Sequence, residues 1–374
     1  MPETKIHALN KAGQSVWLDN INRAMLRSGK LEERISLGLR GMTSNPSIFN
    51  NAVSKSNDYD DEIVALSKAG KNVMEIYDEL TVRDIQDAAD MYKAVYEESD
   101  GLDGYVSLEV DPRLAGKAQE TIDEALRLYQ KVDRPNVMFK VPATPEGFEA
   151  VEELIAAGVN VNVTLIFSMD QYVRTENAYR GGMKRWIAAA GDPGVVASVA
   201  SVFVSRIDSA VDKMLVAKAG EAGDEAEKDR ILSLKGKAAV ANSALIYRKY
   251  LDIISAENFP PCGDKRVRPQ RVLWGSTSTK DPSYPDLKYV TELIGKGTIN
   301  TMPDNTFEAF LDHGEARVVL GPDIGVHQKV IDDLAALGID IDKVNSDLLD
   351  DGVVKFEQAF ESLLGAIKNK MVAR

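Results

Sequence analysis

The sequence predicts an α/β fold, a (β/α)8 TIM barrel with extra helices towards its C-terminal end. Short apolar runs rich in β-forming residues occur eight times along the chain. Longer segments with helical spacing lie between them, which is typical of parallel strands joined by crossover helices. No G-x-G-x-x-G or Walker loop follows any run, so the alternative of a doubly wound, nucleotide-binding sheet gains no support. With neither an internal repeat nor a low-complexity linker, we expect a single domain over residues 1–374.

The expected strands and helices alternate in chain order. The strand runs are Ser15–Asp19, Leu39–Thr43, Tyr105–Val110, Asn136–Val141, Val159–Phe167, Ser198–Val204, Arg271–Gly275 and Thr298–Thr301. The helical segments are Asp58–Ala69, Val82–Glu98, Ala115–Lys131, Gly147–Ala157 and Met169–Ala190, followed after the eighth strand by Val326–Leu337 and Val353–Lys370. Two stretches fit neither pattern: the acidic Gly220–Asp229, which we expect to be solvated, and Glu257–Pro269, an expected loop before the seventh strand. The apolar spacing of the last helix, which includes Phe356, indicates core packing.

Composition and charge exclude several classes of partner. Hydrophobic residues make up 44% and charged residues 28% of the chain, which is normal for a globular protein with a sizeable core. The net charge of -13 disfavours nonspecific binding to nucleic acid or to an anionic membrane. An anionic substrate must then be held by a local basic pocket. No stretch reaches the roughly 20 apolar residues that span a bilayer, and the start of the chain carries no apolar signal core.

Cysteine and histidine are scarce. Cys262 is the one cysteine, so an intrachain disulfide is impossible and a reducing compartment is indicated. With His7, His313 and His327 it makes too small a set for a usual zinc site. We therefore expect a soluble, cytoplasmic protein with no metal, no cofactor, and neither a nucleic-acid nor a membrane partner.

A lysine stands at the end of the fourth expected strand. Alternation along Asn136–Val141 puts Lys140 on the same face as Asn136 and Met138, and in a barrel one of the two faces is the interior. Among apolar neighbours, desolvation lowers the pKa of a lysine, and its neutral amine can form a Schiff base with a carbonyl. Two alternatives stay open: the side chain extends to water, or it pairs with a carboxylate.

Carboxylates end two other strands. Asp19 ends the first run and Glu109 lies near the end of the third. Cleavage of a carbon–carbon bond needs a base for a hydroxyl and an acid for the carbanion, and these residues are candidates for both tasks. An ion pair or a helix N-cap is the alternative for each, although Asp111 suits the cap better than Glu109 does.

Amides and hydroxyls suited to sugar hydroxyls mark the second, fifth and sixth strands. Asn162 and Thr164 share one face of the fifth strand, and a mid-strand position in a cytoplasmic chain argues against their use as a glycosylation sequon. Thr43 and Asn45 follow the second strand, where asparagine before proline also fits a simple turn. Ser201 lies in the sixth strand.

Cations and hydroxyls follow the sixth and seventh strands. Arg206 suits a phosphate, unless it forms a surface pair with Asp208. Ser276 opens a hydroxyl-rich segment that ends in Lys280, and loops after strands seven and eight commonly hold phosphate in such barrels. All these groups are expected at the same end of the barrel, around Lys140. If the site breaks carbon–carbon bonds by aldol chemistry without a metal, it must use an amine as its electron sink. Lys140 is the lysine placed for that role.

Nearly end to end, the sequence resembles transaldolases of the longer bacterial type. The resemblance is carried by Gly41–Ser47, Asn136–Thr144, Asn160–Phe167, Ser201–Arg206 and Lys235–Asn242. It implies that a dihydroxyacetone unit passes from a ketose phosphate to an aldose phosphate. Sedoheptulose 7-phosphate and glyceraldehyde 3-phosphate would give erythrose 4-phosphate and fructose 6-phosphate, in the non-oxidative pentose phosphate pathway.

The resemblance also implies a role for each site residue. Lys140 would form the Schiff base and Asp19 would be the acid/base for carbon–carbon cleavage, while Glu109 and Thr164 would position a water that shuttles protons. The implied substrate-binding residues are Thr43, Asn45, Asn162 and Ser201 for the donor, and Arg206 and Ser276 for the phosphate.

Two positions depart from the family pattern. Ser44 stands where threonine is usual, and Ser278 stands where a second phosphate arginine is expected, with Lys280 as the candidate replacement. A homodimer is left open.

Three rival functions are weighed against this one. A fructose-6-phosphate aldolase-like enzyme releases free dihydroxyacetone, but such enzymes resemble a much shorter chain, and the pair Glu109 and Asp19 favours the transferase. A barrel glycosidase using Glu109 and a second carboxylate would leave Lys140 idle, and aromatic residues at 7% disfavour a sugar-stacking cleft. A non-catalytic binding barrel is disfavoured because no visible part of the site is missing.

Overall fold

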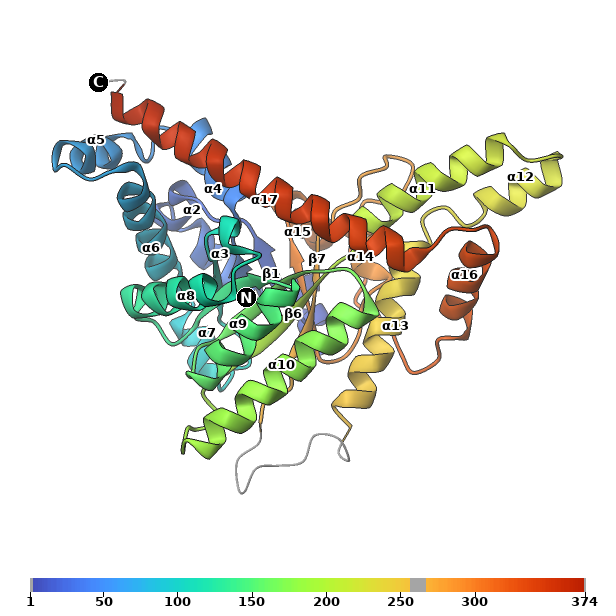
Figure 1. The fold of residues 1–374 in the computed structure, drawn as a ribbon, viewed down its shortest axis with the longest axis horizontal. Coiled ribbons are helices and arrows are strands. Elements are labelled where there is room, and N and C mark those ends of the chain that lie inside the picture. Colours follow the sequence, from blue (N-terminus) through green and yellow to red (C-terminus); the bar gives the residue numbers. More distant parts are fainter. Residues whose placement is uncertain (1–2, 256–266, 373–374) are drawn as a thin grey trace.

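Eight parallel strands close into a barrel at the centre of the computed structural model, which describes residues 3–255 and 267–372 (Figure 1). Each strand pairs with its neighbour in sequence, and β1 closes the barrel by pairing with β8. The strands are β1 Gln14–Asp19, β2 Gly41–Thr43, β3 Val106–Glu109, β4 Val137–Pro142, β5 Val161–Ile166, β6 Ser198–Phe203, β7 Arg271–Gly275 and β8 Thr298–Met302. All eight predicted strands are present, and the (β/α)8 barrel is confirmed.

Helices surround the barrel and connect successive strands (Figure 1). They are α1 Lys5–Lys11, α2 Arg23–Arg27, α3 Lys30–Ser36, α4 Pro46–Lys55, α5 Asp60–Lys68, α6 Val73–Met91, α7 Lys93–Glu98, η1 Pro112–Leu114, α8 Ala118–Val132, α9 Pro145–Ala156, α10 Met169–Ala188, α11 Ser205–Gly220, α12 Glu225–Leu232, α13 Ala238–Ile253, α14 Lys288–Thr291, α15 Asp304–His313, α16 Gly325–Ala336 and α17 Ile341–Val372. Two predictions differ from the observed structure. The segment Val82–Glu98 is not one helix with those bounds, and Gly220–Asp229 contains the start of a helix.

The helix expected from Val82 begins earlier, at Val73, because Asn72 caps it. The Asn72 side chain accepts a hydrogen bond from the backbone N–H of Glu75 at 3.1 Å, and the Glu75 carboxylate accepts one from the N–H of Asn72 at 2.7 Å. This reciprocal arrangement satisfies two backbone donors that a helix start otherwise leaves without partners.

The acidic stretch Gly220–Asp229 is largely exposed, as expected, but α12 begins within it. Asp224 accepts a hydrogen bond from the N–H of Glu227 at 2.8 Å and so caps this helix. Cys262 and most of the expected loop Glu257–Pro269 lie outside the described residues.

The last helix, α17, is longer than the predicted Val353–Lys370 and begins at Ile341. The Asp340 carboxylate accepts hydrogen bonds from the N–H groups of Asp342 and Lys343 at 3.0 and 3.1 Å, which starts the helix a full three turns earlier. In Figure 1 this red helix crosses the whole molecule, from α16 to the pair α4 and α5. The extra C-terminal helices are thus confirmed, and one of them passes over the barrel.

The interior of the barrel is filled at the level where the strands begin and open where they end. A compact apolar layer contains Trp17, Tyr105, Met138, Ala197, Val199, Leu273 and Ile299. Met138 belongs to this layer, so Lys140, two residues further along β4, also points to the barrel interior, as alternation predicted.

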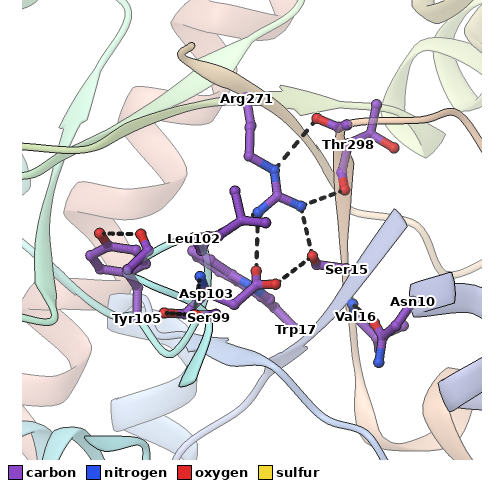
Figure 2. Close-up of polar contacts among 12 residues, drawn as sticks. Asn10, Ser15, Val16, Trp17, Ser99, Leu102, Asp103, Tyr105, Arg271 and Thr298 are labelled. Atoms are coloured by element: carbon purple, nitrogen blue, oxygen red, sulfur yellow. Dashed lines mark hydrogen bonds and ion pairs between the residues drawn. The ribbon is translucent and has the colours of Figure 1, made fainter. Parts of the chain in front are cut away.

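A buried polar network seals the N-terminal end of the barrel beneath that layer (Figure 2). Arg271 donates to Asp103 at 3.0 Å and to the hydroxyl of Ser15 at 2.6 Å, and Ser15 donates to the second oxygen of Asp103 at 2.7 Å. The indole N–H of Trp17 also donates to Asp103, at 3.2 Å. A buried ion pair of this kind is tolerated because each charge finds its partner and further hydrogen bonds.

Candidate active site

A cavity of about 260 Å³ opens at the C-terminal ends of the strands. Its lining is Asp19, Thr43, Asn45, Ser47, Lys140, Thr164, Ser201, Phe203, Arg206, Leu273, Gly275, Ser276, Ser278, Lys280, Thr301, Pro303 and Phe356. All but two of the predicted site residues line it. The two others, Glu109 and Asn162, are buried behind the lining and contact residues that belong to it.

Lys140 is held at the bottom of the cavity by polar neighbours. The parallel register sets Glu109 of β3 beside Lys140 of β4, and the ammonium nitrogen Nζ lies 3.1 Å from Oε2 of Glu109. Nζ also donates a hydrogen bond to the carbonyl of Ser44 at 2.9 Å. Polar groups thus join the apolar neighbours of Lys140, because a buried ammonium requires a counter-charge. Of the two open alternatives, pairing with a carboxylate is confirmed.

Asp19 stands on the other side of the cavity, at the end of β1. The hydroxyl of Thr43 donates to Oδ1 of Asp19 at 2.8 Å and lies 2.7 Å from the hydroxyl of Thr301. Burial raises the pKa of Asp19, while the charges of Lys140 and Lys280 and the bond from Thr43 oppose that rise. The carboxyl is thus fixed in orientation and poised to exchange a proton within the cavity.

Glu109 shows the same electrostatic pattern. Burial raises the pKa of its carboxyl, Lys140 lowers it by charge and by hydrogen bonding, and Asp19 raises it. Two carboxyls with pKa values raised by desolvation therefore flank one amine. Such an arrangement can hold and move protons close to Lys140.

Thr164, in β5, presents a hydroxyl with no protein partner. Its Oγ1 is completely buried, and the described part of the chain offers it no hydrogen bond. Its residue pairs in register with Pro142, two positions after Lys140. Because buried hydroxyls are nearly always hydrogen-bonded, this one is suited to a water or a ligand.

A chain of hydrogen bonds orders the amide and hydroxyls at the back of the site. Ser201 donates to the Oδ1 atom of Asn162 at 2.6 Å, and the amide nitrogen of Asn162 donates to the hydroxyl of Ser107 at 3.1 Å. Asn45 is the N-cap of α4 and accepts from the N–H of Ile48 at 3.0 Å. Asn45 therefore caps a helix and does not form a simple turn. Its side-chain oxygen is used in the cap, so its amide nitrogen is the group that can bind a ligand.

Arg206 brings an uncommitted cation to the cavity. Its Nη1 atom is buried, and no hydrogen-bond acceptor for it exists among residues 3–255 and 267–372. The surface pair with Asp208 is not formed, because Asp208 accepts instead from the N–H of Ala239 at 2.7 Å and from the hydroxyl of Tyr289 at 2.8 Å. Burial lowers the pKa of Arg206, and Asp351 opposes that effect.

Hydroxyls and a second cation lie next to Arg206. Ser276 adopts a left-handed conformation with φ of 54°, and its hydroxyl lies 3.0 Å from that of Ser205. Lys280 donates to the hydroxyl of Ser278 at 2.7 Å. Burial lowers the pKa of Lys280 and the nearby Arg206 lowers it further, whereas Asp19 raises it. Two cations in one lining, with the pKa of Lys280 lowered by the charge of Arg206, mark a place suited to an anion.

Some residues of the site were not predicted from the sequence. Ser44 contributes its carbonyl, Ser107 supports Asn162, and Thr301 supports Thr43. Thr301 ended a predicted strand, as the other candidates did, so its position was a usable signal. Phe356 was assigned to core packing, since nothing in its helix shows that the helix crosses the barrel mouth.

A larger cavity, of about 670 Å³, adjoins the site on the far side of Lys280. Its carboxylates are already engaged: Asp208 binds Tyr289, and Asp212 accepts from the hydroxyl of Tyr284 at 2.5 Å and from the N–H of Gly236 at 2.9 Å. The amine flanked by carboxyls lies in the smaller cavity, which we therefore take as the candidate active site.

Comparison with known proteins agrees with this geometry. Residues 16–367 match the family model described as Transaldolase/Fructose-6-phosphate aldolase. The chain belongs to this family. It is 43% identical over 366 residues to a transaldolase of Trichodesmium erythraeum, covering 97% of this chain and 96% of that protein. It is 44% identical to transaldolases of Saccharopolyspora erythraea, over 98% of each chain, and of Thiobacillus denitrificans, over 96% of this chain and 98% of that protein.

In this family member, the described residues contain no group of three or more histidine, cysteine, aspartate or glutamate side chains arranged to hold a metal ion. Nor does any helix within residues 3–255 and 267–372 have both the length and the apolarity that a bilayer crossing requires.

Proposed function

We propose that this member of the transaldolase family transfers a dihydroxyacetone unit between ketose and aldose phosphates through a Schiff base on Lys140. The observation that carries the proposal is a buried amine at the bottom of a cavity, 3.1 Å from the carboxyl of Glu109, with the uncommitted Arg206 in the same lining. The full-length relatives support transaldolase activity. The reaction would convert sedoheptulose 7-phosphate and glyceraldehyde 3-phosphate to erythrose 4-phosphate and fructose 6-phosphate.

The first step joins the donor ketone to the enzyme. The neutral amine of Lys140 attacks the carbonyl carbon, and loss of water from the adduct leaves an iminium ion. Glu109 is the nearest carboxyl to the amine and is suited to take a proton from it and return one to the departing hydroxyl. The free hydroxyl of Thr164 would hold the water that carries these protons.

The second step breaks the carbon–carbon bond. The iminium accepts the electrons of that bond while a base removes the proton from the neighbouring hydroxyl, and an aldose phosphate leaves. Asp19 suits this base because the hydroxyl of Thr43 donates a hydrogen bond to its carboxyl at 2.8 Å and burial raises its pKa above the ordinary value. Addition of the acceptor aldehyde runs the same steps in reverse.

The donor is held at both ends in this proposal. Asn45, Asn162 and Ser201 would bind hydroxyls of the dihydroxyacetone part near Lys140. The phosphate would lie at Arg206 and Ser276, where the guanidinium has a buried N–H without an acceptor in the described protein. Lys280 would supply the second positive charge in place of the arginine that the family pattern expects at Ser278.

Release of free dihydroxyacetone, the fructose-6-phosphate aldolase reaction, is the second candidate because the family includes both activities by its description. The two are separated by whether an acceptor aldose phosphate is needed for turnover. A glycosidase reaction would leave the lysine without a role, and the family assignment does not favour it.

Borohydride trapping tests the covalent step. Incubation with fructose 6-phosphate and borohydride should inactivate the protein and add one reduced dihydroxyacetone or sugar adduct, which peptide mass mapping should place on Lys140. Trapping without substrate is the control. An adduct on another lysine, or none with full turnover, would contradict the proposal.

We also propose that the protein is cytoplasmic and acts in the non-oxidative pentose phosphate pathway. We expect it to fold as a single domain and to be either a monomer or a homodimer. A single cooperative unfolding transition would support one domain, and sedimentation would decide between monomer and dimer.

A further inference from the structure

The C-terminal helix places an aromatic ring beside the reactive amine. Phe356 lines the cavity, and the centre of its ring lies 5.8 Å from Nζ of Lys140. Only 6% of the residue is exposed. Apart from Phe203, Leu273, Gly275 and Pro303, the other residues of the lining are polar or charged, so this ring adds an apolar wall to a mostly polar site.

Contacts on both sides of Phe356 fix the helix in place. One turn earlier, a Cβ atom on Gly352 would lie 3.0 Å from the Leu165 side chain and 3.6 Å from Nη1 of Arg206. Glycine therefore allows the helix to lie directly against β5 and the proposed phosphate arginine. One turn later, the Phe360 ring packs edge-on against Tyr77 with ring centres 5.0 Å apart.

The end of the same helix is tied to the opposite side of the barrel. Lys370 donates to the carbonyl of Ser56 at 2.7 Å and to Asp60 at 2.5 Å. Because the helix is held at Gly352, Phe360 and Lys370, the ring of Phe356 has little freedom to leave the cavity. It is a fixed part of the wall.

We infer that Phe356 determines the outcome of the covalent intermediate, favouring transfer to an acceptor over release of free dihydroxyacetone. This inference rests on the proposed Schiff-base function of Lys140. The ring lines the cavity beside the amine and so excludes water there, and exclusion of water from an active site suppresses unwanted protonation of reactive intermediates.

The intermediate has two fates that differ in what the enamine carbon bonds to. In transfer, the enamine carbon forms a bond to the aldehyde carbon of the acceptor, and the aldehyde oxygen takes up a proton. In release, the enamine carbon takes up a proton instead, which water in the cavity can deliver. In both fates water then adds to the iminium carbon and the carbon–nitrogen bond to Lys140 breaks, so each consumes one water and returns the free amine.

The test compares these two fates in single-site variants of the full chain. Release is measured as dihydroxyacetone formed from fructose 6-phosphate alone, and transfer as product formed when erythrose 4-phosphate is added. Phe356→Ala should raise the ratio of release to transfer by roughly tenfold or more, because opening the wall admits water. Phe356→Leu, which keeps an apolar side chain, should raise it less and covers the case in which the alanine variant fails to fold.

Two control variants separate this role from simple packing. Phe310→Leu changes a fully buried ring on α15 that does not line the cavity and is not one of the contacts that hold α17, and should lower stability while the ratio stays unchanged. Val354→Ala changes a residue that is 47% exposed and should alter neither quantity.

The outcomes distinguish this inference from the function on which it rests. If borohydride trapping on Lys140 persists in a folded Phe356 variant and the ratio equals that of the unaltered protein, the role of Phe356 is refuted and the proposed function stands. A ratio that rises equally in Phe310→Leu also refutes it. If the unaltered protein gives no adduct on Lys140, the proposed function itself fails.

Discussion

Glu109 and Lys140 lie side by side on adjacent strands, with Oε2 and Nζ 3.1 Å apart, because the register of β3 and β4 pairs their Cα positions. This pairing solves a problem that the sequence poses, namely how a lysine can be buried in a barrel. It also means that each of the two groups affects what happens when the other is replaced.

Replacement of Lys140 should abolish turnover. Lys140→Arg keeps the charge, but a guanidinium stays protonated and cannot act as the nucleophile. Lys140→Met removes the charge. Both variants should lose transfer activity and borohydride trapping, and circular dichroism should report an intact fold. Substantial transfer by Lys140→Met would show that another group carries the chemistry.

The stability of Lys140→Met depends on Glu109. An unpaired buried ammonium is costly, so a lysine without a partner at this position would make the methionine variant at least as stable as the unaltered protein. The ammonium is in fact paired, and Lys140 lowers the pKa of Glu109. Without it, the raised pKa of Glu109 should rise further. Urea unfolding should therefore show little loss at low pH, where the carboxyl is protonated, and a growing loss as the pH rises.

Arg206→Ala should weaken donor binding much more than it disturbs folding. Hydrogen bonds to charged groups are worth roughly 1.5–3 kcal/mol each, so the Michaelis constant for fructose 6-phosphate should rise at least about tenfold. Since Nη1 has no acceptor within the described chain, the free energy of unfolding should scarcely change. Arg174→Ala, at a half-exposed arginine outside the cavity, is the control. An unchanged Michaelis constant would exclude Arg206 from phosphate binding.

Chelation should leave activity intact. The proposed electron sink is an iminium on Lys140, which needs no metal ion. Assays of transfer before and after prolonged incubation with EDTA should give the same rate. Complete loss with EDTA, reversed by zinc, would contradict the Schiff-base proposal.

Glu176 on α10 should make folding stability depend on pH. Burial raises the pKa of its carboxyl to about 8, and Arg180 only partly opposes this. The folded protein thus holds a proton that the unfolded chain releases near its ordinary pKa of about 4.3. Its contribution is fully present below that value and is lost as the pH rises through about 8.

Glu176→Gln removes this titration and so tests it. Relative to the unaltered protein, the variant should gain stability progressively from about pH 4.3 upwards, by an amount on the order of 3–5 kcal/mol once the pH exceeds the folded-state pKa. The comparison is made by urea unfolding at several pH values. Parallel stability profiles for the two proteins would show that Glu176 does not titrate with folding.

The sequence was informative wherever local pattern decides structure. The apolar runs located every strand, and polar residues at their ends located most of the cavity, because parallel strands of a barrel all end at one side. Alternation along β4 correctly assigned Lys140 to the interior. These inferences need only the period of a strand and the topology of the barrel.

What the sequence did not reveal depends on contacts between distant segments. The partner of Lys140 follows from the register of two strands separated by a helix. Arg206 is left uncommitted because Asp208 bonds to Ala239 and Tyr289, which lie on other helices. The place of Phe356 follows from the path of α17 across the barrel, and no spacing rule for a helix specifies its direction in space.

The Arg271–Asp103 network separates the part of the barrel that stabilises the fold from the part that carries the proposed chemistry, which matters for protein engineering. It secures the end opposite the cavity with side chains that, within residues 3–255 and 267–372, share no hydrogen bond with the side chains of the proposed catalytic residues. Substitutions around Arg206 or Lys280 that change substrate preference therefore leave the contacts that hold the opposite end of the barrel intact. Conversely, a library that varies Ser15, Asp103 or Arg271 would sample thermal tolerance while leaving the chemistry of the open end unaltered.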